Sequence, residues 1–141
     1  MLKNIPKNIS PDLLKILAEM GHGDEIVLAD GNFPAASNAK RLVRADGLDV
    51  LTLLEDILTL FPLDTYVEHP ITLMDTVLGD PTPTIWQNYY NTIAKHEPNA
   101  KAKNVERFEF YQQAKNAYAI VATTETALYA NIILKKGVVK A

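Results

Sequence analysis

The residues best equipped for chemistry lie on either side of one short apolar segment. His22 precedes the apolar run at 26–29, and Asp30 follows it directly. An imidazole exchanges protons near neutral pH because its ordinary pKa is about 6.5, and a carboxylate can orient such a group or accept a proton itself. The two residues therefore indicate general acid–base chemistry carried by one rigid element, with Asp30 orienting His22.

Further hydrogen-bonding residues lie near later apolar segments. Tyr129 and Asn131 precede the apolar run at 132–134, and Arg107 lies ahead of an expected short helix. Together with His22 and Asp30 they supply an imidazole, a carboxylate, a phenol, an amide and a guanidinium, but no evident nucleophile. Such a set suits a ligand with many hydroxyl groups.

Each of these residues also has an ordinary structural interpretation. His22 could cap the preceding helix, and Asp30 could belong to a simple turn. Arg107 could form a surface ion pair, and Tyr129 and Asn131 could lie on a strand edge. Only the combination favours a ligand site.

Metal, thiol and phosphate chemistry have little support. A metal site would need His22, Asp24 and Asp30 to converge, while His69 and His96 lie beside prolines in expected loops. The chain has no cysteine, and no serine lies in a strained elbow. The glycines around His22 lack the further glycines and the following helix of a dinucleotide loop. We therefore expect no metal and no cofactor.

Composition limits the class of protein and its partners. The chain has 141 residues and a formal net charge of -3, with no long run of lysine or arginine, which argues against nucleic acid or an anionic membrane as the main partner. The absence of cysteine is compatible with a cytoplasmic protein. No apolar run approaches the roughly 20 residues that span a bilayer. We expect a soluble protein with a single domain over residues 1–141.

The elements that must position these residues follow from the apolar spacing. Ser10 as N-cap, Pro11 at the first helical position and Gly21 as a stop predict the first helix. Further helices are expected at 51–61, from 82–83 to 93, and at 112–116. Strands are expected at 26–29, 42–43, 71–77, 119–122 and 132–134. This alternation predicts a three-layer α/β protein with helices on both sides of the sheet.

The helix that begins at 82–83 has an aromatic face. Its apolar positions recur at helical spacing, and we interpret them as core or as a subunit interface. They are Ile85, Trp86, Tyr89, Tyr90 and Ile93.

Several sequence blocks in this order resemble the family that L-fucose mutarotase shares with D-ribose pyranase. The blocks cover nearly the whole chain and lie at 17–26, 32–35, 44–48, 106–111, 129–131 and 134–138. The block at 106–111, with Arg107, resembles the fucose branch, because the ribose branch has a histidine-containing segment there. One departure is Ala130, where the family pattern leads us to expect glycine.

The resemblance implies a fold, an activity and a site. The fold is a three-layer α/β/α domain with a mixed central sheet. The activity is mutarotation, in which the sugar ring opens and recloses with the other anomeric configuration, without a cofactor. The family's sugar site maps onto His22, Asp30 and Tyr129 as catalytic residues, and onto Asp30, Arg107, Tyr129 and Asn131 as substrate-binding residues.

The resemblance also implies a cytoplasmic homo-oligomer, either a decamer or a dimer. Two alternatives stay open. The protein could be a mutarotase or pyranase for another monosaccharide such as D-ribose, although Arg107 in place of histidine speaks against ribose. It could also be a non-catalytic monosaccharide-binding accessory protein, which would use the same hydroxyl-binding residues but would not need His22 to titrate.

Overall fold

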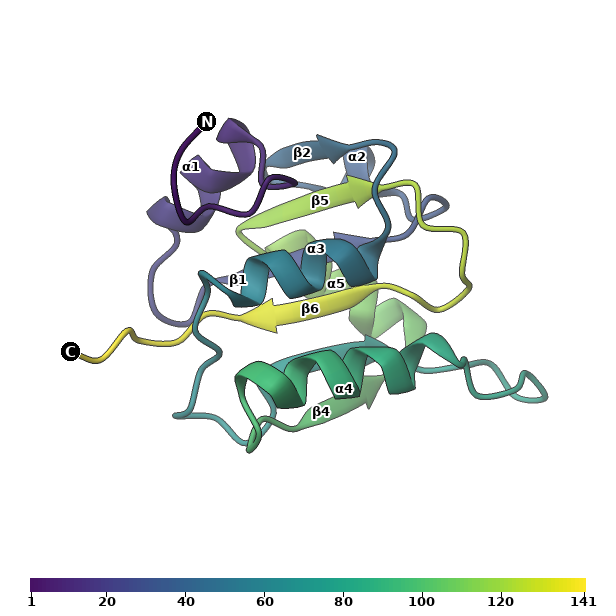
Figure 1. Cartoon of the computed structure of the whole chain (residues 1–141). Helices are drawn as coiled ribbons and strands as arrows, with labels where there is room; N and C mark the ends of the chain where they lie inside the picture. The colour runs from purple at the N-terminus through teal and green to yellow at the C-terminus, as the bar shows by residue number, and fades with distance from the viewer.

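A mixed sheet of six strands forms the centre of the computed structural model, which describes residues 1–141 (Figure 1). The strand order is β2-β5-β1-β6-β3-β4. The strands are β1 (Glu25–Ala29), β2 (Leu42–Ala45), β3 (Ile71–Met74), β4 (Ala102–Val105), β5 (Ala119–Thr123) and β6 (Ile132–Lys135). Only β6 runs against its neighbours, pairing antiparallel with both β1 and β3.

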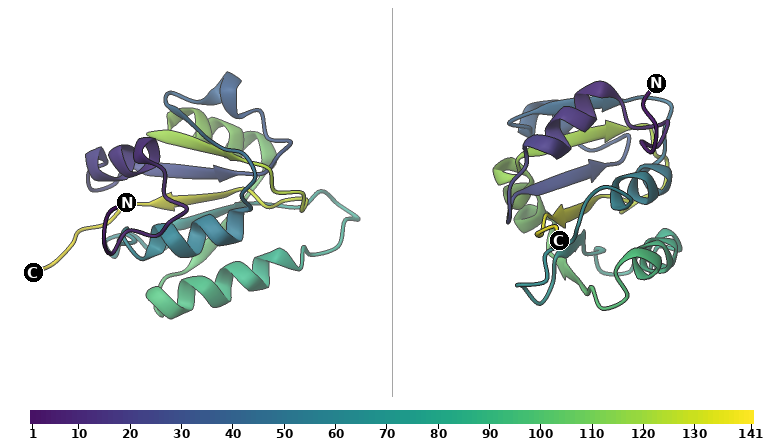
Figure 2. Two further views of the ribbon diagram at one scale, coloured as in Figure 1. Left: turned by 45° about the horizontal axis from the view of Figure 1, so that its top comes forward. Right: turned by 60° about the vertical axis from the view of Figure 1, so that its left-hand side comes forward.

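Helices cover both faces of the sheet, as the alternating pattern predicts (Figure 2). On one face lie α1 (Pro11–Glu19), α3 (Val50–Leu58) and α4 (Ile85–His96), and on the other lie α2 (Ala35–Asn38) and α5 (Arg107–Asn116). The central strand β1 contributes Ile26 and Leu28 to the first core and Val27 and Ala29 to the second. No helix is both long enough and apolar enough to cross a membrane. The three-layer α/β prediction is confirmed.

Strand direction sorts the connecting loops into two groups. Because β1 to β5 share one direction, the segments after these strands meet at one edge of the sheet, where β6 begins. This carboxyl edge lies at the right of Figure 1. The segments before β1 and before β3 meet the end of β6 at the opposite edge, which we call the amino edge.

Two expected helices begin at clearly different residues in the structure. The last helix begins at Arg107 rather than at 112, because the Glu106 side chain caps it by accepting hydrogen bonds from the backbone N–H groups of Phe108 and Glu109. The helix α4 begins at Ile85 rather than at 82–83. Its face also differs from the prediction, since Tyr90 is 38% exposed while Trp86 and Tyr89 are buried.

The remaining differences concern the ends of two elements and two elements that the sequence did not predict. The strand β3 ends at Met74, so Val77 lies outside it, and α3 ends at Leu58, before the expected limit at 61. The edge strand β4 was not predicted, because Lys103 and Asn104 in its middle are exposed and show no apolar pattern. The four-residue α2 is too short to leave a periodic signal.

The C-terminal segment packs tightly against the chain ahead of β3. The N–H of Gly137 donates to the Pro62 carbonyl at 2.7 Å. A Cβ atom at position 137 would lie 2.5 Å from the Leu63 carbonyl oxygen and 2.8 Å from the Asp64 Cα. Only a residue without a side chain allows this approach.

We predict that Gly137→Ala lowers the free energy of unfolding by about 1–3 kcal/mol, the usual cost of inserting an atom into a closely packed site. Gly21→Ala is the matched control, because its Cβ would meet Asp24 at 3.7 Å, an ordinary contact. Urea unfolding of both variants measures the difference. Equal stability of the two variants would contradict the packing argument.

Candidate active site

A small cavity opens at the carboxyl edge of the sheet. Asp30 follows β1, and Tyr129 and Asn131 lie in the connection from β5 to β6, so the strand order brings them together. The cavity has a volume of about 210 Å³, below the roughly 300–1,000 Å³ of sites for drug-sized ligands. Its lining consists of Asp30, Asn32, Phe33, Met74, Asp80, Tyr111, Leu128, Tyr129 and Asn131.

Asp30 is the buried carboxylate of this cavity. Only 8% of the residue is exposed. Its backbone N–H donates to the Asn131 Oδ1 at 2.7 Å, and its Oδ1 accepts from the Asn32 backbone N–H at 3.0 Å. Burial raises the pKa of Asp30 above its ordinary value, although hydrogen bonds from neighbouring backbone N–H groups and from Asn131 oppose this. A carboxylate of this kind exchanges protons closer to neutral pH than a free aspartate does.

Side chains of the helix α4 hold the backbone at Tyr129 and Ala130 in place. Tyr129 has a left-handed φ of 55°, which is uncommon for a residue other than glycine. The indole Nε1–H of Trp86 donates to the Tyr129 carbonyl at 2.9 Å, and the hydroxyl of Tyr89 donates to the Ala130 carbonyl at 2.7 Å. Ala130 itself does not have a positive φ, so this position does not require the expected glycine.

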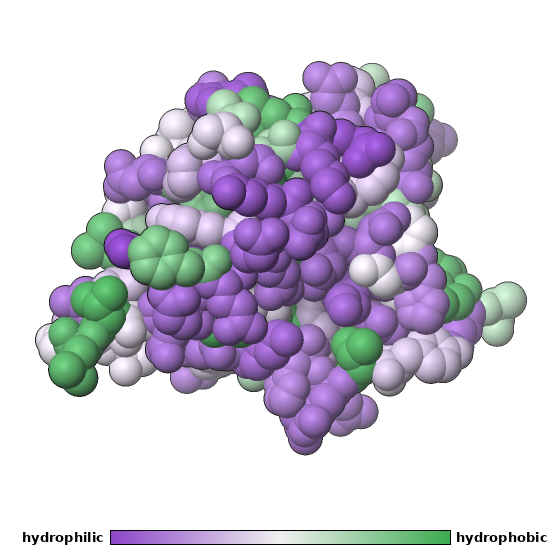
Figure 3. Space-filling view, turned by 180° about the vertical axis from the view of Figure 1, so that it is seen from behind, coloured by the Kyte–Doolittle hydropathy of each residue, from purple (hydrophilic) through white to green (hydrophobic).

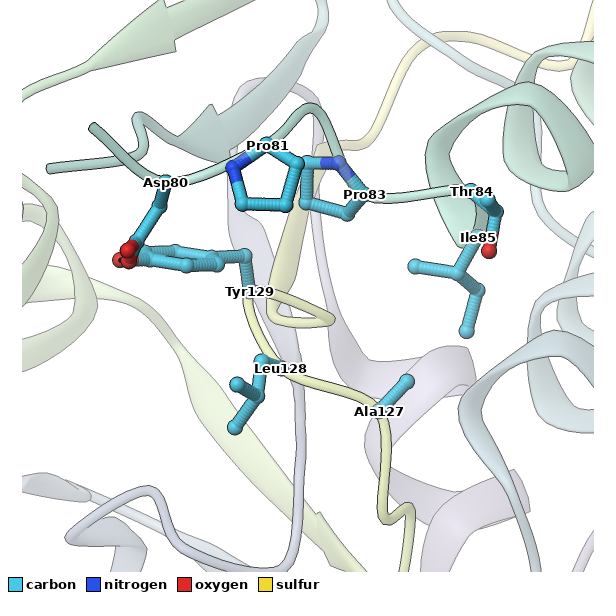
Figure 4. Close-up of a pocket in the computed structure, with 8 residues that line it drawn as sticks. All are labelled: Asp80, Pro81, Pro83, Thr84, Ile85, Ala127, Leu128 and Tyr129. Atoms are coloured by element: carbon cyan, nitrogen blue, oxygen red, sulfur yellow. Dashed lines mark hydrogen bonds between the residues drawn. The ribbon is translucent and has the colours of Figure 1, made fainter. Parts of the chain in front are cut away.

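The phenol of Tyr129 lies between two loops (Figure 4). Its hydroxyl donates a hydrogen bond to Asp80 and accepts the Val77 N–H at 3.3 Å. The hydrogen bond to Asp80 raises the pKa of Tyr129, whereas the positive charge of Arg107 acts in the opposite direction. A second cavity, of about 250 Å³, shares Asp80, Leu128 and Tyr129 with the first.

Sequence reasoning missed Asp80. Its position directly before Pro81 indicates no more than a turn. Its partner Tyr129 lies 49 positions away, so no local pattern could show the contact.

Arg107 lies at the start of α5, at the carboxyl edge of the sheet, but it lines neither of the two cavities. Its guanidinium carbon lies 4.7 Å from the centre of the Phe108 ring. The exposed apolar residues Leu78, Phe108 and Leu128 belong to loops and a helix start at the same edge. Apolar side chains are seen at this end of the molecule in Figure 3. This edge of the sheet therefore combines a cation with exposed apolar side chains.

The structure does not bring His22 to this cavity. His22 precedes β1 and Asp30 follows it, so the two residues lie at opposite edges of the sheet. At roughly 3.3 Å per residue, the five residues of β1 alone span about 16 Å. The interpretation that Asp30 orients His22 is therefore wrong within one chain.

Asp64, rather than Asp30, is the carboxylate that lies beside His22. The His22 Nε2 lies 3.0 Å from the Asp64 Oδ1. Sequence reasoning missed this residue, because the contact joins positions 42 residues apart and Asp64 lies in a segment without periodic structure. No group of three or more histidine, aspartate or glutamate side chains is placed to hold a metal ion.

Comparison with known proteins places this geometry in a family. The model of the RbsD / FucU transport protein family matches residues 3–139. The crystal structure of a fucose mutarotase from Streptococcus pneumoniae in complex with L-fucose superposes with a TM-score of 0.95 and 57% sequence identity, covering 99% of this chain and 100% of that one.

Two curated relatives are similar to the chain over nearly its whole length. The fucose mutarotase of Mus musculus is 54% identical, covering 96% of this chain and 94% of the relative. The L-fucose mutarotase of Actinobacillus pleuropneumoniae is also 54% identical, covering 98% of this chain and 97% of the relative. With the family model matching almost every residue, these similarities show that the chain belongs to the RbsD / FucU transport protein family.

Proposed function

We propose that the protein is an isomerase that interconverts the α and β anomers of L-fucose. The observation that carries the proposal is the cavity in which Asp30, Tyr129 and Asn131 converge. A phenol, an amide and a buried carboxylate provide donors and acceptors for several hydroxyl groups. The similarity to a fucose mutarotase that was crystallised with L-fucose supports the choice of sugar.

Mutarotation needs two proton transfers and no redox change. A base removes the proton of the anomeric hydroxyl while an acid delivers a proton to the ring oxygen. The bond between the anomeric carbon and the ring oxygen breaks, and an open-chain aldehyde forms. Rotation about the adjacent carbon–carbon bond and reversal of the two transfers give the other anomer.

We assign the residues of the cavity to these tasks. Asp30 exchanges a proton with the sugar, since its carboxylate lines the cavity and burial raises its pKa toward neutral pH. Tyr129 aids proton transfer through its hydroxyl, which already donates to Asp80. Asn131 and Arg107 hold sugar hydroxyls, and the planar guanidinium offers two parallel donors to adjacent oxygens.

The position of His22 leads us to propose a shared site between copies of the chain. His22 is catalytic only if it meets the sugar, and within one copy it lies at the amino edge, away from Asp30. A neighbouring copy would supply it. The exposed Leu78, Phe108 and Leu128 at the carboxyl edge provide apolar surface for such a contact.

The assembly and its location complete the proposal. A closed homo-oligomer repeats each kind of contact at every symmetry-related pair of copies, and a decamer is the form we propose. We also propose a cytoplasmic location, with which the cysteine-free sequence is compatible.

Exchange spectroscopy by NMR tests the activity directly. We expect the protein to accelerate anomer exchange of L-fucose more than that of D-ribose.

We expect Arg107→His to reduce fucose exchange, because an imidazole cannot donate two parallel hydrogen bonds to adjacent hydroxyls. Wild-type fucose exchange in this variant would remove Arg107 from the site. Fucose binding without any acceleration of exchange would favour the non-catalytic binding protein.

Asp30→Asn should lower the rate of anomer exchange without lowering the stability of the protein at pH 7. We expect anomer exchange to fall by about 10²-fold or more, because the amide cannot exchange a proton. Burial raises the pKa of Asp30 in the folded protein, so protonated Asp30 favours folding below about pH 3.8, and this contribution disappears as pH rises through the folded-state pKa.

The variant should therefore be more stable than the wild type at pH 7, and this advantage should shrink toward pH 3.5. Urea unfolding at both pH values, at a fixed protein concentration, measures the difference. A difference in the free energy of unfolding that is the same at both pH values would contradict the raised pKa of Asp30.

Mixed oligomers test whether the site is shared between copies. His22→Asn and Asp30→Asn should each be nearly inactive alone. When the two variants are co-expressed and assemble at random, about a quarter of the contacts would pair an intact His22 with an intact Asp30, and exchange should recover to about that fraction. If each variant is inactive alone and co-purified mixed oligomers show no recovery, the proposal of a site shared between copies fails.

A further inference from the structure

Three segments that are distant in the sequence form a fixed junction around His22 at the amino edge. They are the loop before β1, the segment 62–66 and the end of β6. Backbone hydrogen bonds of 2.7–3.0 Å join Gly23 to Lys136, Lys136 to Asp24, Asp64 to Lys135, and Gly137 to Pro62. His22 and Asp64 are therefore presented from a hydrogen-bonded framework rather than from free loops.

The carboxylate of Asp64 is built into this framework. Its side chain is 4% exposed, whereas that of His22 is 46% exposed. One oxygen, Oδ1, lies 3.0 Å from the His22 Nε2 and accepts the backbone N–H of Tyr66 at 3.0 Å. The buried partner thus fixes the orientation of the partly exposed ring.

Asp64 is held as an anion. Burial acts to raise its pKa, but the hydrogen bonds from Tyr66 and His22, with a smaller influence of Lys135, outweigh burial and leave the pKa below its ordinary value. An ionised carboxylate can only accept hydrogen bonds. The hydrogen of the neutral His22 ring must therefore be on Nε2, where it can be donated to Asp64.

This arrangement determines which ring nitrogen is free to react. A neutral imidazole carries one N–H, so a hydrogen on Nε2 leaves Nδ1 as the unprotonated base. The Tyr66 ring, with its centre 5.2 Å from that of His22, packs against the imidazole and restricts its rotation. Almost half of the His22 side chain is open to a ligand.

We infer that Asp64 is a positioning residue for His22, and that it assigns proton exchange with the sugar to Nδ1 of the imidazole. This inference rests on the proposed mutarotase function. When Nδ1 takes a proton, the ring becomes a cation, and the Asp64 carboxylate 3.0 Å from Nε2 stabilises it without itself accepting the proton.

The variant Asp64→Asn tests the inference. Its amide oxygen can still accept the Tyr66 N–H, so the turn is retained, but the negative charge is lost. We expect exchange of L-fucose to slow by about 10- to 100-fold at saturating sugar, part of a general acid–base contribution, with the KM for fucose changed by less than about twofold. ¹⁵N NMR of the neutral His22 ring should show Nε2–H in the wild type and a mixture of the two tautomers in the variant.

Asp24→Asn is the matched control. Asp24 lies in the same loop as His22, and its carboxylate accepts the Gly21 N–H at 2.8 Å rather than contacting the ring. We expect wild-type exchange and an unchanged tautomer in this variant. A loss of exchange equal to that of Asp64→Asn would attribute the effect to the charge of the loop and overturn the inference.

The other outcomes separate the inference from the proposed function. If His22→Asn exchanges fucose at the wild-type rate, the proposed role of His22 fails. If His22→Asn is slow but Asp64→Asn keeps both the wild-type rate and the Nε2–H tautomer, only the role of Asp64 fails. Should Asp64→Asn not fold, the wild-type spectrum still decides, since an Nδ1–H tautomer contradicts the assignment.

Discussion

The antiparallel placement of β6 between two strands that share one direction is the constraint on which the rest of the structure depends. It returns the chain from β5 into the middle of the sheet, directly beside the end of β1. The hydrogen bond from the Asp30 N–H to the Asn131 side chain then joins the exit of one strand to the entrance of the other. A carboxylate and an amide become neighbours because the sheet brings their backbones together, although 101 positions separate them.

The same strand directions divide the polar residues between two edges. Asp30, Tyr129 and Arg107 belong to the carboxyl edge, and His22 with Asp64 belongs to the amino edge. His22 therefore does not reach the cavity that Asp30 and Tyr129 line within one copy of the chain. A site that used both groups, as proposed above, would have to combine the carboxyl edge of one copy with the amino edge of another.

The sequence could predict what depends on local pattern. The buried strands around 26–29 and 119–122, the first helix and the three-layer class followed from apolar spacing and from Ser10 and Pro11 as start signals. The exposed strand β4 had no such signal. Among candidate site residues, Asp30 and Asn131 meet as the strand ends suggested, whereas Asp64 and Asp80 were missed because only tertiary contacts give them partners.

The left-handed backbone at Tyr129 has a consequence for binding. A non-glycine residue in this conformation costs roughly 1 kcal/mol or more, and it persists only where its surroundings enforce it. Here the buried Trp86 and Tyr89 of α4 enforce it from behind the cavity. The backbone that carries the phenol is thus fixed when the chain folds, and ligand binding does not have to order it. A monosaccharide makes few contacts. Its affinity therefore benefits most when binding does not include the entropic cost of ordering the protein.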